Sequence, residues 1–374
     1  MDYLGQIQLT DNLRILITFL ISAIGTWYVI PILVRIAHSS KMYDHPNLRT
    51  VHFNPTPRLA GIAIFLAVIL TQSLFTRSLS FPLYQYVIAG SVIIFFIGIK
   101  DDILGISFGK KFVAEIAAAL ILILFADLRI NSFHGYFGAK EISYTLSFFI
   151  TLIIIIGITN AFNLIDGVDG LSGTLALTSF ATFGVWFYIN NQPGYALLCA
   201  ATIGSLLAFL RFNIWGKKNK IFMGDTGALF LGFLMSILLI RFNEMNLNSL
   251  IPWHIEASPV VSFGILIIPI FDTCRVMLSR ILQGKSPFQP DKTHIHHQLL
   301  NLGFSHKQVT AILFLVSIGY IILSFEMQHL NLYLGTTILV GSGLILTYIP
   351  IYINQKKKHT VPWTVIKTAK KKAG

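Results

Sequence analysis

The side chains best suited to chemistry lie in one polar stretch, NAFNLIDGVDGLSG at residues 160–173. Asn160, Asn163, Asp166 and Asp169 recur there every three residues, directly after the apolar run TLIIIIGIT. Carboxylates and carboxamides at the end of an apolar run are costly to bury without a cation or a hydrogen-bonding ligand. Three-residue steps each fall back about 60° on an ideal helix, so a glycine-permitted turn is needed to bring the four together. The alternative is a polar loop between two helices.

Two further stretches add carboxylates beside apolar runs. KDDILGISFGKKF begins with Lys100 and places Asp101 next to Asp102, and adjacent carboxylates repel each other unless a cation lies nearby. Lys110 and Lys111 follow and can neutralise that pair or hold a phosphate. In KIFMGDTGALFLG, Asp225 stands where an apolar run restarts, which predicts either a helix N-cap or a carboxylate offered to a metal.

A basic stretch precedes these acids in the chain. DHPNLRTVHFNPTPRLAG combines Arg49, His52 and Arg58 with three prolines, which stiffen an extended segment. It is either an ordinary polar loop or a basic rim for an anionic substrate.

Three histidines lie close together in QGKSPFQPDKTHIHHQLLNLGFSHKQ, namely His294, His296 and His297. A zinc site is one interpretation, but the stretch lacks cysteine partners and the helical HExxH spacing. Because the acids elsewhere offer hard oxygen ligands, magnesium is favoured over zinc. The imidazoles are then better interpreted as hydrogen-bond donors to phosphate oxygens.

The elements that must position these residues are membrane helices. The 374 residues are 54% apolar and only 12% charged, and the mean hydropathy is +0.70. Soluble domains carry about 25% charged residues. The long continuous apolar runs lack the period-two alternation of an outer-membrane barrel, so the sequence predicts an all-α, polytopic integral membrane bundle.

A window of about 19 residues predicts eleven membrane spans, or ten if one segment is re-entrant. They cover residues 13–36, 59–76, 82–99, 112–127, 144–162, 170–189, 194–212, 226–241, 258–281, 309–327 and 332–353. We expect one transmembrane catalytic domain over residues 1–355, followed by a basic cytoplasmic tail at 356–374.

Basic residues predict the orientation of these spans. One set of connections and the C-terminal tail hold 23 of the 28 lysines and arginines, whereas the opposite connections hold 5. By the positive-inside rule, the side with more lysines and arginines is cytoplasmic. This predicts that the N-terminus lies outside and the C-terminus lies in the cytoplasm. This topology explains the net charge of +12 better than nucleic-acid binding does. The acids described above fall on the same side, so the chemistry is expected to face the cytoplasm.

The five cytoplasmic connections together offer acids, amides, lysine, arginine and histidine. Magnesium prefers carboxylate and phosphate oxygens and retains several waters. Phosphoryl transfer needs a metal, cationic clamps and positioning, with little covalent work from the protein. The combination therefore favours a cytoplasm-facing transferase that acts on a diphosphate substrate.

In their order along the chain, these motifs resemble the polyprenyl-phosphate N-acetylhexosamine-1-phosphate transferases. The likeness extends over roughly residues 44–308 and includes the histidine motif. It implies a helical bundle of ten or eleven spans in the bacterial cytoplasmic membrane, with the active site on the cytoplasmic face. It also implies transfer from a UDP-amino sugar to a polyprenyl phosphate, releasing UMP, with Mg²⁺ as cofactor and Mn²⁺ as its substitute. A homodimer is compatible with the family.

The resemblance also assigns roles to individual residues. Asp225 looks like the magnesium ligand, with Asn163 as a second ligand. The remaining assignments are Asp166 and Asp169 to the nucleotide, Asp101 and Asp102 to the catalytic acid pair, Lys111 to phosphate, His294, His296 and His297 to the sugar and diphosphate, and Arg49, His52 and Arg58 to substrate binding. Lys111 is preferred to Lys110 because Lys111 and Phe112 form the Lys-Phe pair of the family pattern. Ala60-Gly61 replaces the two glycines found in many members.

The histidine motif also indicates a branch of the family. HIHH followed by QLLNLGFSHKQ resembles the N-acetylglucosamine-1-phosphate branch that begins teichoic acid or lipopolysaccharide synthesis. Other UDP-N-acetylhexosamines, and the phospho-MurNAc-pentapeptide of the peptidoglycan branch, are alternatives. A secondary transporter is a further alternative of a different class, although the acids gather at one membrane face and matching broken repeats are not seen.

Overall fold

A computed structural model describes residues 10–40, 56–76, 81–138, 141–286 and 293–360, and every regular element in these ranges is a helix. The α-helices are α1 (Asp11–Ser39), α2 (Ala60–Phe75), α3 (Tyr84–Leu104), α4 (Phe108–Phe125), α5 (Tyr144–Ile165), α6 (Leu171–Ile189), α7 (Pro193–Trp215), α8 (Gly224–Met245), α9 (Ser258–Ile265), α10 (Ile267–Leu282), α11 (Ile295–Asn301), α12 (His306–Glu326) and α13 (Leu332–Thr360). Two short 3₁₀ turns, η2 (Tyr136–Gly138) and η3 (Met327–His329), complete them. This confirms the predicted all-α membrane class.

Each predicted span coincides with a helix, but span 258–281 is broken into α9 and α10 at an 83° bend. Seven of the described helices are long and apolar enough to cross a membrane, namely α1, α5, α6, α7, α8, α12 and α13. The bent pair would make an eighth span if it crosses as one, and α2 is a shorter apolar helix. Eleven spans and the orientation of the termini therefore stay predictions. Helix α13 continues to Thr360, so the first residues of the predicted tail are helical.

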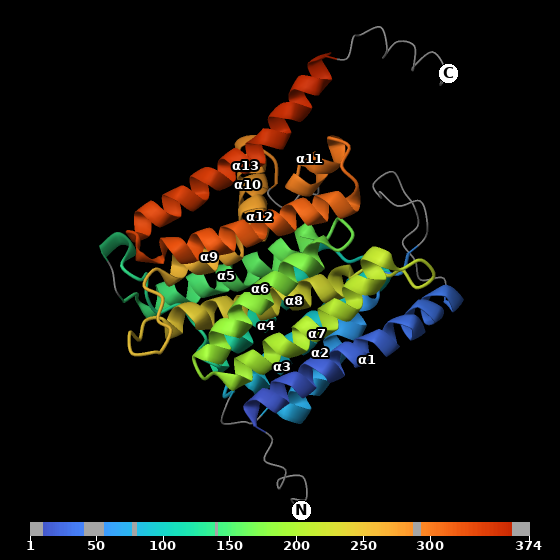
Figure 1. The fold of residues 1–374 in the computed structure, drawn as a ribbon, viewed down its shortest axis with the longest axis horizontal. Helices are drawn as coiled ribbons and strands as arrows, with labels where there is room; N and C mark the ends of the chain where they lie inside the picture. Colours follow the sequence, from blue (N-terminus) through green and yellow to red (C-terminus); the bar gives the residue numbers. More distant parts are fainter. Residues whose placement is uncertain (1–9, 41–55, 77–80, 139–140, 287–292, 361–374) are drawn as a thin grey trace, which may run out of the picture.

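The bundle is organised around α8. Its side chains are buried along nearly the whole helix, and Phe230, Phe233 and Phe242 are fully enclosed. Helices α2, α3, α5 and α6 pack against it, while α1 lies outside against α2 and α7 (Figure 1). Burial of this apolar face in protein fits an inner helix of a membrane bundle, where helices touch each other rather than lipid.

Several helix ends that were far apart in the sequence meet at one end of the bundle. Helix α3 ends where Gly105 adopts a φ of +62°, and α4 begins after a turn of three residues. The segment before α2 is tied to the segment before α8, since the Phe222 N–H donates to the Pro57 carbonyl at 2.8 Å. The Gly61 N–H donates to the Met223 carbonyl at 2.9 Å. These connections bring the starts of α2, α4 and α8 together with the end of α3.

Candidate active site

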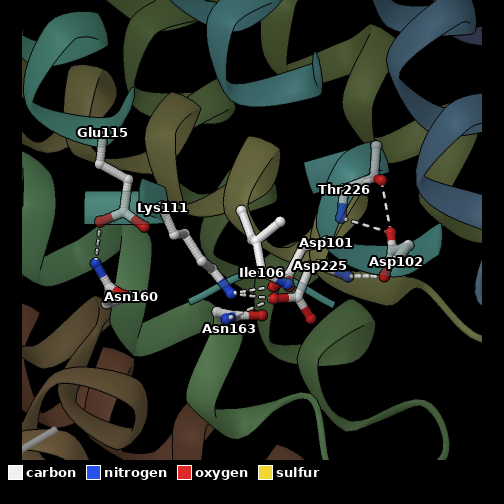
Figure 2. Close-up of polar contacts among 9 residues, drawn as sticks. All are labelled: Asp101, Asp102, Ile106, Lys111, Glu115, Asn160, Asn163, Asp225 and Thr226. Carbon is white, nitrogen blue, oxygen red and sulfur yellow. Dashed lines mark hydrogen bonds and ion pairs between the residues drawn. The ribbon is translucent and has the colours of Figure 1, made fainter. Parts of the chain in front are cut away.

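The centre of the site is the ammonium group of Lys111, at the start of α4. Its Nζ atom donates to Asp101 Oδ2 at 2.8 Å and also forms an ion pair with Asp225 Oδ2 (Figure 2). Asn163, near the end of α5, donates to the same Asp225 oxygen at 3.3 Å. Four helices, α3, α4, α5 and α8, thus contribute one polar side chain each. Lys111 is buried whereas Lys110 is exposed, which agrees with the choice of Lys111.

Asp102 has a different environment from its neighbour Asp101. Its carboxylate accepts the backbone N–H groups of Asp225 at 2.8 Å and Thr226 at 2.9 Å, and the Thr226 hydroxyl at 2.6 Å (Figure 2). It therefore caps the N-terminus of α8, where unpaired N–H groups and the helix dipole favour an anion. The interpretation of Asp225 as the N-cap is wrong, because Asp225 lies inside the first turn of α8 and its side chain caps no N–H group of that helix. Asp102, at the end of α3, accepts the first N–H groups of α8 instead. Asp225 is left to face Lys111.

Gly224 makes this arrangement sterically possible. Its φ of +74° lies in the left-handed region, which glycine adopts without cost. A Cβ atom at this position would lie 2.6 Å from Asp102 Oδ2 and would also collide with the backbone carbonyl of Arg58. The glycine of the Gly-Asp-Thr-Gly motif thus lets the carboxylate of α3 reach the first turn of α8.

Asp166 and Asp169 lie in the turn between α5 and α6 and contact different residues. Asp166 Oδ1 accepts the Ser172 hydroxyl. Desolvation raises the pKa of Asp166 to about 7, and the Asp225 and Asp102 carboxylates act in the same direction. Asp169 Oδ2 pairs with Lys220 Nζ at 2.6 Å. The four regularly spaced residues therefore do not converge on one point, because Asp169 is directed to the loop before α8.

The histidine motif is attached to the site through α10 and the α5–α6 turn. His294 Nδ1 lies 2.8 Å from Asp272 Oδ2, and Arg275 donates to the other oxygen of Asp272 at 2.7 Å. His296 packs against the α5–α6 turn so closely that a Cβ atom at Gly167 would lie 2.7 Å from its Nε2. Burial, followed by the charge of His297, lowers the pKa of His296 to about 3, so this imidazole is neutral.

The remaining predicted residues are placed as follows. Arg49 and His52 lie outside the described residues. Arg58 is exposed at the segment before α2, and its charge acts on Asp166. Asn160, one turn before Asn163, bonds to Glu115 of α4 instead of joining the Lys111 cluster.

Sequence reasoning missed three ionisable residues that contact the predicted ones. Lys220 and His306 both approach Asp169, the latter with 3.7 Å between Nδ1 and Oδ2. Asp272 holds His294 and was overlooked inside predicted span 258–281. An ionisable residue within an apolar run was the signal for it, since such residues are costly unless they have a partner.

A magnesium ion would find suitable donors beside Asp225. Its carboxylate is a hard oxygen source, and the Lys111 ammonium already stands in as a cation there. The Asn163 amide donates its N–H to the same oxygen here and would offer its own oxygen to a metal after a flip of the amide. Magnesium commonly uses one or two protein carboxylates and takes its other ligands from substrate phosphates and water. Across the described ranges, no group of three or more His, Cys, Asp or Glu is arranged to hold a metal. The donor set thus fits Mg²⁺ or Mn²⁺ shared with a substrate.

Comparison with known proteins agrees with this geometry. The model of Glycosyl transferase family 4 matches residues 84–243, which contain Asp101, Lys111, Asn163 and Asp225. The chain is 32% identical over 333 residues to the probable undecaprenyl-phosphate N-acetylglucosaminyl 1-phosphate transferase of Bacillus subtilis (strain 168), covering 87% of this chain and 88% of the relative.

Two enterobacterial relatives cover a slightly smaller part. The undecaprenyl-phosphate alpha-N-acetylglucosaminyl 1-phosphate transferase of Escherichia coli (strain K12) is 30% identical over 286 residues, or 76% of each chain. The Salmonella typhi protein of the same name is 31% identical over the same length and coverage. These likenesses confirm the resemblance seen in the motifs: the chain belongs to the polyprenyl-phosphate N-acetylhexosamine-1-phosphate transferase family.

Proposed function

We propose that this protein transfers N-acetylglucosamine 1-phosphate from UDP-N-acetylglucosamine to undecaprenyl phosphate, giving undecaprenyl-diphosphate-N-acetylglucosamine and UMP. Family membership and the names of the relatives support this reaction. The observation that carries it is the Lys111 ammonium held between Asp101 and Asp225 where four helix ends meet. A buried cation flanked by carboxylates is suited to receive both a divalent metal and a diphosphate.

In the proposed reaction, an oxygen of the lipid phosphate attacks the β-phosphorus of the nucleotide sugar. The bond from that phosphorus to the bridging oxygen breaks, and UMP leaves with the oxygen. Asp225 and Asn163 would hold Mg²⁺, which supplies positive charge to the diphosphate oxygens. The Lys111 ammonium would supply a second positive charge to the site.

Asp101 and Asp102 have different roles in this proposal. A phosphate monoester has a second pKa near 6 and is largely ionised at neutral pH, so the acceptor does not require a strong base. Asp101 orients Lys111, and Asp102 fixes the start of α8 through three hydrogen bonds. Both therefore act as positioning groups for the cation cluster.

The substrate-binding residues of this proposal lie in the α5–α6 turn, the histidine motif and the segment before α2. Asp166 and Asp169 lie in the α5–α6 turn, where we assign them to the nucleotide. His294, His296 and His297 are assigned to the sugar and diphosphate, and His296 contacts the same turn. Neutral His296 can donate one hydrogen bond to a phosphate oxygen but adds no charge. Arg58 is assigned to the basic rim that would bind the anionic substrate.

We further propose that the site faces the cytoplasm in the bacterial cytoplasmic membrane. The distribution of 23 basic residues against 5 supports this orientation. In such a location the enzyme would carry out the first membrane step of a cell-envelope glycan. The candidate acids Asp101 and Asp225 lie in end turns of α3 and α8, which fits an interfacial enzyme better than a mid-membrane transport path.

The test is release of UMP by the purified full chain. Undecaprenyl phosphate and Mg²⁺ are supplied with UDP-N-acetylglucosamine, other UDP-N-acetylhexosamines or UDP-MurNAc-pentapeptide in parallel. We expect UMP from UDP-N-acetylglucosamine, dependent on both lipid and metal. Release only from the pentapeptide donor would move the protein to the peptidoglycan branch, and no release from any donor would overturn the transferase assignment.

A further inference from the structure

Glu115 is a buried carboxylate next to the cluster, and neither the family motifs nor the proposed reaction uses it. It lies on α4, one turn after Lys111, and its side chain is only 2% exposed. One oxygen, Oε2, accepts the amide N–H of Asn160 on α5 (Figure 2). The other oxygen, Oε1, is buried and accepts no hydrogen bond from any described residue. A buried carboxylate oxygen without a donor is costly, so its retention calls for an explanation.

The nearest cation is Lys111. Residues four apart are neighbours on one face of a helix. Figure 2 places Glu115 and Lys111 side by side on α4, and the Lys111 charge acts on the Glu115 carboxylate. In this structure, however, Lys111 Nζ bonds to Asp101 and Asp225. Lys111 therefore pairs with two carboxylates, those of Asp101 and Asp225. A third carboxylate, Glu115, lies on the same helix and has one oxygen without a hydrogen-bond donor among the described residues.

Metal binding would disturb this balance. A divalent ion that binds Asp225 through Oδ2 would compete with the Lys111 ammonium, because Lys111 already forms an ion pair with that oxygen. The displaced ammonium would remain buried, and a buried charge without a full set of partners is strongly destabilising. Glu115 Oε1, four residues along the same helix, is a carboxylate oxygen unpartnered within the described part of the chain, so we expect the displaced ammonium to turn towards it.

We propose that Glu115 is a positioning residue that receives Lys111 when a divalent metal takes its place on Asp225. Asn160, to which the family resemblance assigns no role, holds the Glu115 carboxylate in position for this exchange. The proposal rests on the assignment of Asp225 as metal ligand within the proposed function.

The test measures metal affinity directly. The full chain, purified in detergent, is titrated with Mn²⁺ while the paramagnetic resonance signal of free Mn²⁺ is recorded, and Mg²⁺ is added as competitor. Glu115→Gln keeps an oxygen for Asn160 but removes the charge. We expect it to raise the Kd for Mn²⁺ about tenfold, as for the loss of one charge-assisted hydrogen bond in the metal-bound state. Glu244→Gln is the matched control, since Glu244 also bonds an asparagine, Asn131, but lies at the other end of α8.

A double-mutant cycle separates exchange from simple attraction between Glu115 and the ion. Lys111→Gln removes the competing ammonium and should lower the Kd. In that background Glu115→Gln should change the Kd by less than about twofold, because no lysine remains to be received. An unchanged Kd in the single variant, or the same tenfold effect in both backgrounds, would overturn the proposal.

The same preparations also separate this inference from the proposed function. Wild-type UMP release without coupling between Lys111 and Glu115 would overturn the inference alone. Absence of UMP release together with measurable coupling would overturn the transferase assignment but not the lysine exchange. Absence of any Mn²⁺ binding to the wild-type protein would overturn the metal assignment and the exchange together.

Discussion

Asp102 accepts the backbone N–H of Asp225 at 2.8 Å, so one carboxylate of the acid pair determines where the proposed metal ligand stands. Both carboxylate oxygens of Asp102 accept hydrogen bonds from α8, because the Thr226 N–H and hydroxyl donate to the second oxygen. Asp101 instead faces the cation cluster. Two adjacent residues of the same type thus act on different parts of the site, one on the helix and one on Lys111.

Asp102→Asn should lower stability and metal affinity together. The amide nitrogen that replaces one oxygen cannot accept from the α8 terminus, and the loss of a helix cap costs about 1–2 kcal/mol. We expect a lower unfolding temperature and weaker Mn²⁺ binding, with an unchanged pH profile for UMP release. A fall in turnover of about 10²-fold or more, with unchanged stability and metal affinity, would instead assign Asp102 as a general base.

Gly224→Ala should be more damaging than Gly105→Ala. Both glycines have positive φ, +74° and +62°, and an L-residue in that region costs about 1–2 kcal/mol. A Cβ atom at Gly105 meets nothing within 4 Å, whereas at Gly224 it would strike the Asp102 carboxylate and the Arg58 backbone. Unfolding in detergent should therefore show a larger loss for Gly224→Ala, and Mn²⁺ binding should weaken only in that variant. Equal losses would contradict a steric requirement at Gly224.

Asp272→Asn should destabilise the α10–α11 contact. Asp272 is 3% exposed and is shared by His294, Arg275 and the Ile295 N–H. Removing one partner of a buried ion pair costs about 3–5 kcal/mol, because the remaining charge stays buried.

Asp127→Asn is the control for that variant, since Asp127 also pairs with an arginine, Arg129, but its side chain is 74% exposed. Exposed pairs contribute little to stability. Denaturant unfolding in detergent should separate the two variants clearly. If both lose the same small amount, Asp272 does not hold the histidine motif in place.

Much of this arrangement was predictable from the sequence, for physical reasons. Long apolar runs specify helices directly, so the predicted spans fall on helices. The charge repulsion of the Asp pair indicated a lysine partner at position 110 or 111, and the family resemblance indicated Lys111. The pairing of Lys111 with Asp101 agrees with that expectation. The capping of α8 by Asp102 was not predictable from the sequence, since this contact joins residues 123 positions apart. Such contacts depend on packing between helices, which the composition of one segment does not encode.

The same limit explains Glu115 and the bend between α9 and α10. No motif in the sequence singles out Glu115, and only the approach of α5 gives it Asn160 as a partner. Residues 258–281 are continuously apolar enough to suggest one straight span, yet α9 and α10 meet at 83°. The bend directs α10 towards the histidine motif and places Asp272 beside His294.

His296→Gln should make the protein less sensitive to acid. The folded-state pKa of His296 is lowered to about 3, first by burial and then by His297, from an ordinary value of 6.5. Between these values the unfolded chain binds a proton that the folded chain does not, so stability falls as the pH falls below about 6.5. At pH 5 this single group removes about 2 kcal/mol. Glutamine does not titrate, so the loss of stability between pH 7 and pH 5 should be smaller by about that amount.

The comparison is made within each variant across pH, so any fixed cost of replacing the buried imidazole cancels. His329→Gln is the control, because the His329 side chain is 73% exposed and lies 3.8 Å from the Glu256 carboxylate. It should lose as much stability as the wild-type protein over the same pH interval. The ionisable neighbours of His296, namely His294, His297, His306 and Asp272, are present in wild type and in both variants, so the comparison isolates the imidazole that is replaced. If His296→Gln loses stability in parallel with wild type, the imidazole is protonated in the folded state and can bring positive charge to a phosphate.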